Sequence, residues 1–163
     1  MQKVFAAKLT QSLRVAIQKF SAEDIKKITI FCAVYLVYIE ISLLFFYSYF
    51  FYNSFIFFLA ILSGLLGRFI LHPLVHFFYK PERPDEFSWI EKPKTPSFPS
   101  GHATFLFAIA FLYLYFSFFL GLILSAFALI VGAARVYAGV HRWEDIFGSA
   151  LVAILAASII YHF

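Results

Sequence analysis

The stretch from Phe105 to Ala134 contains no charged side chain. One α-helix over this stretch would be about 45 Å long, whereas the hydrocarbon core of a bilayer is roughly 30 Å thick. We therefore expect two membrane-spanning helices between Ser100 and Gly139, joined by a tight turn near Ser117 to Gly121. The composition agrees, because 63% of the 163 residues are hydrophobic and only 13% are charged, compared with about 25% in soluble domains.

Three further apolar segments complete the predicted set of spans. They run from Ile28 to Phe50, from Phe55 to Tyr79 and from Ile146 to Phe163. We predict an all-α fold, an integral membrane bundle of about five transmembrane helices, formed by a single domain over residues 1–163. The only cysteine, Cys32, excludes an internal disulfide.

Residues 1–20 have a different pattern. Apolar side chains recur near helical spacing, and the basic and amide side chains fall largely between them. This pattern is typical of a basic amphipathic helix that lies in the membrane interface. We predict an N-terminal amphipathic interfacial helix here, with a frayed tail as the alternative. Lys8 and Arg14 would interrupt the apolar core of a secretory signal, so that interpretation is disfavoured.

Residues 80–99 cannot lie in hydrocarbon, because they contain five prolines and eight charged residues. We expect a surface loop between the second and third spans. The third span then leaves this face of the membrane and the fourth returns to it. The polar residues around these span ends therefore gather at one face, and they are Lys80, Arg83, Ser100, His102, Arg135, His141 and Asp145.

The chemistry of this set suits a tetrahedral oxyanion. Lysine and arginine are permanent cations, and the helix start at Ser100 offers free N–H groups to an anion. Asp145 follows His141 by one helical turn, a spacing that lets a carboxylate hold one imidazole nitrogen and leave the other free. Each residue alone has a simpler interpretation, as an interfacial anchor or a side chain that snorkels to headgroups. A metal site is disfavoured, because no cysteine or His-Glu-x-x-His motif accompanies the histidines.

Three segments of this face resemble the three signatures of the type 2 phosphatidic-acid phosphatase and haloperoxidase superfamily. These segments are K-P-E-R-P, P-S-G-H and A-R-V-Y-A-G-V-H-R-W-E-D. The second segment matches its signature fully, and the third keeps the family's spacing of Arg, His and Asp, with Ala134 in place of a serine. The first keeps Arg83-Pro84, but His76 stands where the family has lysine, and Lys80 lies nearer the arginine.

The resemblance implies a role for each matched residue. His141 would attack phosphorus and carry a phosphohistidine, Asp145 would orient it, and His102 would protonate the leaving oxygen. The implied phosphate-binding residues are Lys80, Arg83, Ser100, Gly101, Arg135 and His76. Either His76 or Lys80 would fill the position of the family's lysine. The resemblance implies no cofactor and no metal.

The implied function is that of a small bacterial membrane lipid phosphatase, similar to polyprenyl-diphosphate or lipid A 1-phosphatases. It would hydrolyse a phosphomonoester or diphosphate on lipid A 1-phosphate, undecaprenyl diphosphate, phosphatidylglycerol phosphate or phosphatidic acid. The alternative is a non-catalytic phospholipid-binding or transport protein, which would need no pairing of histidine with aspartate. The family's haloperoxidases are soluble, which disfavours them here.

The expected partners are the lipid substrate and the bilayer. We infer no protein partner and no nucleic acid, because the net charge of +4 is modest and the basic residues lie between apolar spans. The expected location is the inner membrane, as a multi-pass protein whose site faces the periplasm. Positive-inside counting of the N-terminal segment favours the cytoplasmic face instead.

Two charged residues lie well inside the predicted spans, Glu40 in the first and Arg68 in the second. A charge at mid-span costs roughly 2.5–3.5 kcal/mol, so such residues pair or face a cavity. The two spans are antiparallel neighbours, and the residues lie at similar depth. We predict that Glu40 is the counter-charge of Arg68, with snorkelling or local hydration as the alternative. Arg68, His72, His76 and Lys80 also form a stripe predicted to face the bundle interior and lead to the site.

Overall fold

The computed structural model describes residues 21–51, 53–84 and 87–163. The predicted interfacial helix at residues 1–20 lies outside the described residues. The described part of the chain contains helices and coil and no strand, which confirms the all-α prediction. The elements in chain order are α2 (Ala22–Val34), α3 (Leu36–Phe51), α4 (Ser54–Leu66), the π-helical turn η1 (Gly67–Leu71), α5 (His72–Phe78), α6 (Gly101–Phe116), α7 (Phe118–Tyr137) and α8 (Trp143–His162).

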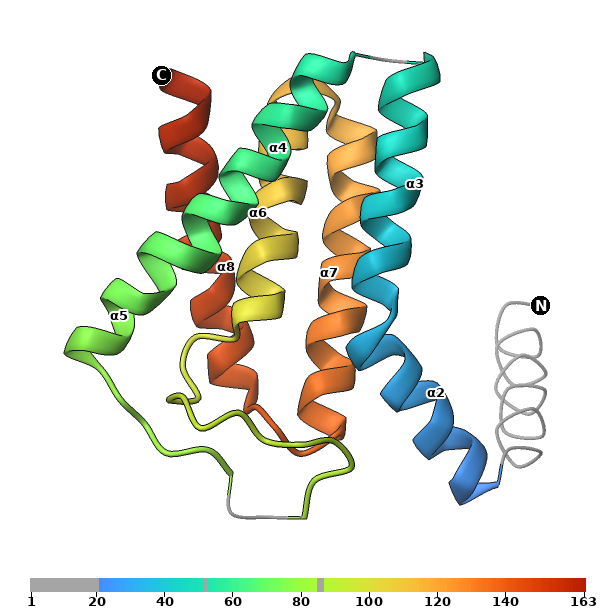
Figure 1. The fold of residues 1–163 in the computed structure, drawn as a ribbon, viewed down its shortest axis with the longest axis vertical. Helices are drawn as coiled ribbons and strands as arrows, with labels where there is room; N and C mark the ends of the chain where they lie inside the picture. Colours follow the sequence, from blue (N-terminus) through green and yellow to red (C-terminus); the bar gives the residue numbers. More distant parts are fainter. Residues whose placement is uncertain (1–20, 52, 85–86) are drawn as a thin grey trace, which may run out of the picture.

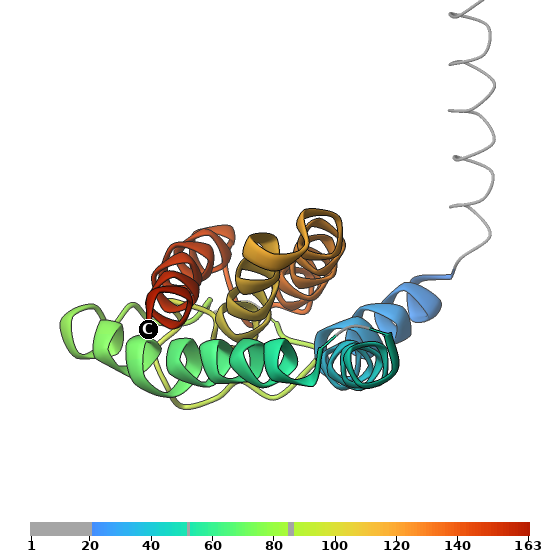
Figure 2. The same ribbon diagram turned by 90° about the horizontal axis from the view of Figure 1, so that it is seen from above.

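Helix α6 lies at the centre of the bundle and packs against α4, α7 and α8 (Figures 1 and 2). Small side chains on α6 permit this close approach of three neighbours. Ala103, Ala108 and Ala110 have no exposed surface. Helices α2 and α3 lie against α7 at the edge of the bundle.

The connection between α6 and α7 is a tight turn, as predicted. α6 ends at Phe116, α7 begins at Phe118, and Ser117 alone separates them. The loop between α5 and α6, the start of α6, the end of α7 and the start of α8 therefore meet at one end of the bundle (bottom of Figure 1). The charged segment at residues 80–99 forms this loop, and its described residues contain no helix or strand.

The second predicted span is a single helical run of 25 residues from Ser54 to Phe78. It widens at η1, where the N–H group of His72 donates to the carbonyl of Gly67. Pro73 accounts for this, because its ring lacks an N–H donor and clashes with the carbonyl four residues earlier. The π-helical turn holds Arg68, and such turns are frequent at functional sites.

The first predicted span is not one straight helix. α2 and α3 are bent by 50° at a break that contains Tyr35. Within the described ranges, three helices are long and apolar enough to cross a membrane. They are the run from α4 to α5, α7 and α8, and the bent pair would be a fourth span. α6 is apolar but has only 16 residues. The protein is an integral membrane helical bundle. Two of the predicted spans differ from expectation, because α2–α3 is bent and α6 is shorter than predicted.

Candidate active site

His141 lies in the short connection between α7 and α8, and its side chain is almost fully buried. Its Nδ1 atom lies 3.2 Å from Oδ2 of Asp145 in the first turn of α8. Its Nε2 atom lies 3.4 Å from Nη1 of Arg83. When the ring proton is on Nδ1, this N–H group donates a hydrogen bond to the carboxylate. The lone pair of Nε2 is then free and faces the guanidinium. The pairing predicted from the four-residue spacing is thus present in the structure.

The charge state of His141 follows from its surroundings. Burial lowers the pKa of the His141 imidazole, the hydrogen bond to Asp145 raises it, and the positive charges of Arg135 and Arg83 lower it again. The net effect is a pKa below the ordinary value of 6.5. His141 is therefore neutral near pH 7, which is the state in which an imidazole nitrogen can act as a nucleophile.

The carboxylate of Asp145 is held by two further donors. The hydroxyl of Ser97 donates a short hydrogen bond to Oδ2, and the backbone N–H of Arg142 donates to the same oxygen over 2.8 Å. Ser97 is buried in the loop before α6. Its contact with Asp145 joins the loop to α8, and neither the spacing nor the signatures of the sequence pointed to it.

Arg83 joins the loop to the connection between α7 and α8. Its Nε atom donates to the carbonyls of Pro93 and Thr95, each over 3.0 Å. Its Nη1 atom donates to the carbonyl of Val140 over 2.8 Å. Burial lowers the pKa of Arg83, Asp145 raises it and Arg68 lowers it. The guanidinium is therefore fixed by carbonyl groups with one nitrogen beside the reactive atom of His141.

The start of α6 is anchored to α8 through Ser149. The hydroxyl of Ser149 lies 2.8 Å from the N atom of Ser100, 2.9 Å from the Ser100 carbonyl and 2.6 Å from the Asp145 carbonyl. The N–H of Ser100, predicted to bind phosphate, is thus already bonded. Thr104 is the first residue of α6 bonded within the helix, to the carbonyl of Ser100. The N–H groups between these two residues remain for an anion.

Buried polar atoms without a hydrogen-bond partner concentrate at this end of the bundle. Among the described residues they are the two carboxylate oxygens of Glu40, Nε2 of His76, Oγ of Ser100 and Nε of Arg135. The last three belong to predicted site residues. Buried polar groups in folded proteins are normally paired, so three unpaired ones around one helix start indicate a position for a polar ligand.

Arg135 and His102 lie on the two helices that flank this position. Arg135, in the last turn of α7, is 4% exposed, and its Nη1 atom donates to the carbonyl of Ala33 over 3.2 Å. His102, in the first turn of α6, is half-buried and lies within electrostatic range of Arg135, Arg68 and His141. The structure therefore gathers both histidines and two of the predicted arginines.

The two candidates for the family's lysine lie in different environments. His76 is half-buried, and its ring centroid lies 4.1 Å from that of His72. Lys80 is exposed and borders a hollow in the loop whose lining also includes Arg83, Lys92 and Lys94. Among the described residues, no hydrogen bond or ion pair joins Lys80 to His141 or His102. The structure brings His76 into the site and leaves Lys80 at its outer edge.

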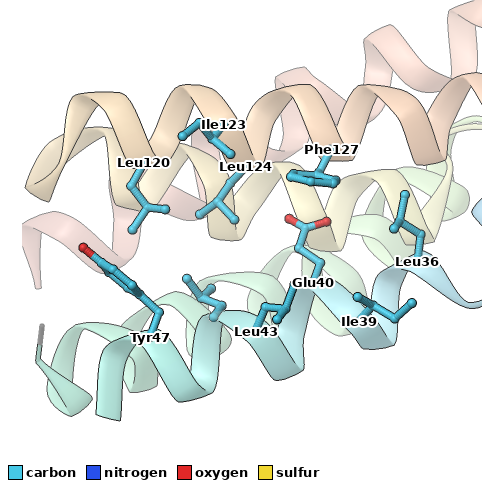
Figure 3. A pocket seen from close by; sticks show the side chains of 10 residues that line it. Leu36, Ile39, Glu40, Leu43, Tyr47, Leu120, Ile123, Leu124 and Phe127 are labelled. Carbon is cyan, nitrogen blue, oxygen red and sulfur yellow. The ribbon is translucent and has the colours of Figure 1, made fainter. Parts of the chain in front are cut away.

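The predicted ion pair between Glu40 and Arg68 is wrong. Both oxygens of Glu40 lack a partner, and its side chain points toward Phe127 of α7 rather than toward α4 (Figure 3). Glu40 lies in a cavity of about 220 Å³ whose other lining residues are Leu36, Ile39, Leu43, Leu44, Tyr47, Leu120, Ile123, Leu124 and Phe127. Similar depth does not fix which way a helix faces, and α3 packs against α7 as well as against α4.

The predicted stripe toward the site is present for its first three residues. Nη1 of Arg68 lies 3.4 Å from Nδ1 of His72, and the rings of His72 and His76 are in tilted contact. The guanidinium of Arg68 lies against Gly101, where an added methyl group would overlap it. Arg68 and His72 were predicted to lead to the site but were not among its predicted phosphate-binding residues.

The described residues contain no group of three or more histidine, cysteine, aspartate or glutamate side chains that could hold a metal ion. The polar groups at the site are mainly cations and N–H donors. This set of donors fits an anion rather than a cation.

Two solved membrane proteins share this arrangement of helices. Aquifex aeolicus LpxE is 25% identical, with a TM-score of 0.71, over 94% of this chain and 94% of that chain. The first transmembrane PAP2 type phosphatidylglycerolphosphate phosphatase from Bacillus subtilis is 21% identical, with a TM-score of 0.61, over 100% of this chain and 87% of that chain. A comparison with curated protein sequences gives no match.

The sequence also matches a family model, and the match covers every residue of the candidate site. The model describes the PAP2 superfamily and matches residues 49–163. This range contains the loop, α6, α7 and α8 together with Arg68 and His76. The resemblance noted in the sequence is confirmed, and the chain belongs to the PAP2 superfamily.

Proposed function

We propose that the protein is a metal-independent membrane lipid phosphatase that acts through a phosphohistidine on His141. Membership of the family and the likeness to LpxE support an activity on the phosphate group of a membrane lipid. The observation that carries the proposal is the buried pair of His141 and Asp145, whose free Nε2 atom faces Arg83.

In the first step the lone pair of Nε2 of His141 forms a bond to phosphorus. The bond between phosphorus and the lipid oxygen breaks, and the leaving oxygen takes a proton from His102. In the second step a water oxygen attacks the phosphohistidine and gives a proton back to His102. The N–P bond breaks, and inorganic phosphate leaves. Fixed positive groups such as Arg83 and Arg135 favour the charge that develops on the phosphoryl oxygens.

The substrate class is a lipid with a phosphomonoester or diphosphate at headgroup depth. LpxE is a lipid A 1-phosphatase and the second neighbour is a phosphatidylglycerolphosphate phosphatase. The panel to compare is therefore lipid A 1-phosphate, phosphatidylglycerol phosphate, undecaprenyl diphosphate and phosphatidic acid.

The test is phosphate release from each of these lipids by purified protein, with and without excess EDTA. We expect release from at least one lipid, unchanged by EDTA, and no release by His141→Ala. His102→Ala should still form a phosphoenzyme from an analogue with a good leaving group, and quenching in base would preserve its N–P bond. Binding of these lipids without release from any would favour the alternative, a non-catalytic phospholipid-binding or transport protein. A tenth of wild-type activity in His141→Ala would exclude the nucleophile assignment.

We also propose an inner-membrane location with the site at the periplasmic face. The test uses Lys94, an exposed residue of the loop at the site end of the bundle. Lys94→Cys in a Cys32→Ser background should react with a membrane-impermeant maleimide in intact cells. Labelling that appears only after the inner membrane is permeabilised would place the site on the cytoplasmic side.

A further inference from the structure

Arg68 reaches the start of α6 from a neighbouring helix. It lies in the π-helical turn η1, and its half-buried guanidinium occupies the space in which a side chain at Gly101 would begin. The N–H groups of the first turn of α6 point toward this end of the helix. Arg68 therefore presents its N–H donors at the same place as the backbone donors of the predicted phosphate site.

The guanidinium has no carboxylate partner. Neither ion pair among the described residues includes Arg68. Its Nη1 atom lies 3.4 and 3.5 Å from the two ring nitrogens of His72. Nε2 of His72 lies 3.0 Å from the carbonyl of Pro99 and must donate to it, which leaves Nδ1 as the acceptor for Arg68. A half-buried guanidinium with one long hydrogen bond retains several unused donors.

Arg68 also lies among other positive groups. Its charge acts on Arg83, on Arg135 and on His102. Like charges gathered in a buried region repel one another, and an anion held between them removes that repulsion. The arrangement of these groups around the start of α6 is one that an oxyanion would stabilise.

We propose that Arg68 contacts the phosphate oxygens of the substrate and supplies the third cation of the site, which His76 and Lys80 do not. This inference rests on the proposed function and adds a residue to it. The ring of His76 lies against that of His72, with the two rings tilted by 57°, and Lys80 is exposed at the outer edge of the site. Arg68 lies roughly two helical turns before His76 in the same helical run, so the phosphate would sit between Arg68 and Arg83.

The experiment compares Arg68→Met, Arg68→Lys and Lys80→Met in the full-length protein, with Lys27→Met on the exposed face of α2 as the control. Vanadate is the probe, read both as inhibition of phosphate release and as thermal stabilisation in detergent. We expect Arg68→Met to weaken vanadate binding by about tenfold to a hundredfold, the usual effect of losing a charge-assisted hydrogen bond. Arg68→Lys should lose less, Lys80→Met should lose less than Arg68→Met, and Lys27→Met should match the wild type.

A rescue variant tests the position of the missing cation. His76→Lys in the Arg68→Met background places a lysine where the family has one, and it should recover part of the vanadate affinity. Gly101→Ala, which would displace the guanidinium, provides a second test if Arg68→Met does not fold, and it should weaken vanadate binding without removing the charge. Vanadate affinity in Arg68→Met within twofold of the wild type, or a larger loss in Lys80→Met, would overturn the inference. A different outcome would separate the two proposals. If vanadate stabilises the protein against heat only when Arg68 is present, but the protein releases phosphate from no lipid, the proposed function is refuted and the contact of Arg68 with an anion is retained.

Discussion

The Nδ1 atom of His141 and the Oδ2 atom of Asp145 lie 3.2 Å apart in the buried interior of one end of the bundle. The carboxylate is itself held by the hydroxyl of Ser97 and the N–H of Arg142. This chain of hydrogen bonds fixes the plane of the imidazole and directs Nε2 toward Arg83. The position of the reactive nitrogen thus depends on contacts from the loop as well as from α8.

The acid dependence of the reaction should report the state of His141. Burial and the neighbouring arginines lower its pKa, so kcat/KM should fall with decreasing pH through an apparent pKa below 6.5. The hydrogen bond to Asp145 raises the pKa of His141, and Asp145→Asn removes that contribution. We expect Asp145→Asn to move the acid limb to lower pH while the rate drops roughly 10²- to 10⁴-fold.

The measurement is the pH profile of kcat/KM for wild type and Asp145→Asn with the best substrate of the panel.

The lowered pKa of His141 also makes the free energy of unfolding depend on pH. Because His141 binds a proton more weakly in the folded than in the unfolded state, its contribution to stability is full above pH 6.5 and is lost as the pH falls below that value. An acid limb that moves upward in Asp145→Asn would contradict the assignment.

Ser97 should act as a positioning residue for Asp145. Ser97→Ala removes a buried hydrogen bond to the carboxylate, and we expect kcat to fall about tenfold with KM changed less than threefold. Ser125→Ala is the matched control, because the hydroxyl of Ser125 donates to the carbonyl of Gly121 within α7. Equal effects of the two substitutions on kcat, or an effect of Ser97→Ala on KM alone, would argue against this role.

The sequence was sufficient to predict the elements that hold the site. The length of the stretch without charged residues predicted the turn at Ser117. Because successive spans cross the membrane in opposite directions, this turn then placed His102, Arg135 and His141 at one end of the bundle. It was not sufficient for the contact of Ser97 with Asp145, because that contact depends on the path of an irregular loop. The side to which Glu40 points was also missed, since the apolar residues around Glu40 give no pattern that shows whether this face of α3 meets α4 or α7.

Gly148 should be required for the packing of the loop on α8. A methyl group at this position would overlap the ring of Phe98, which also packs edge-on against Tyr79 at a centroid distance of 5.3 Å. Gly148→Ala should therefore destabilise the protein by about 1–3 kcal/mol and lower activity by displacing the loop. Phe98→Leu in the same chain removes part of the ring and should recover some stability, as read by thermal unfolding in detergent. Losses that simply add in the double variant would show that the two side chains do not meet.

Glu40 should destabilise the bundle rather than contribute an ion pair. Glu40 is 5% exposed, its carboxylate has no hydrogen-bond partner among the described residues, and apolar side chains of α3 and α7 line the cavity around it (Figure 3). Burial of an unpaired polar group costs about 1–3 kcal/mol. Glu40→Leu should therefore raise the midpoint of thermal unfolding, whereas Glu23→Leu on the exposed part of α2 should leave it nearly unchanged.

A double-mutant cycle separates this expectation from an ion pair with Arg68. If the two side chains do not interact, Glu40→Leu should stabilise the Arg68→Met variant by the same amount as the wild type, within about 0.5 kcal/mol. An ion pair would give the opposite pattern, because removal of one partner leaves a buried charge and removal of both relieves it. If Glu40→Leu destabilises the protein and Arg68→Met rescues it, the two side chains form an ion pair. That outcome would contradict the orientation of Glu40 toward α7.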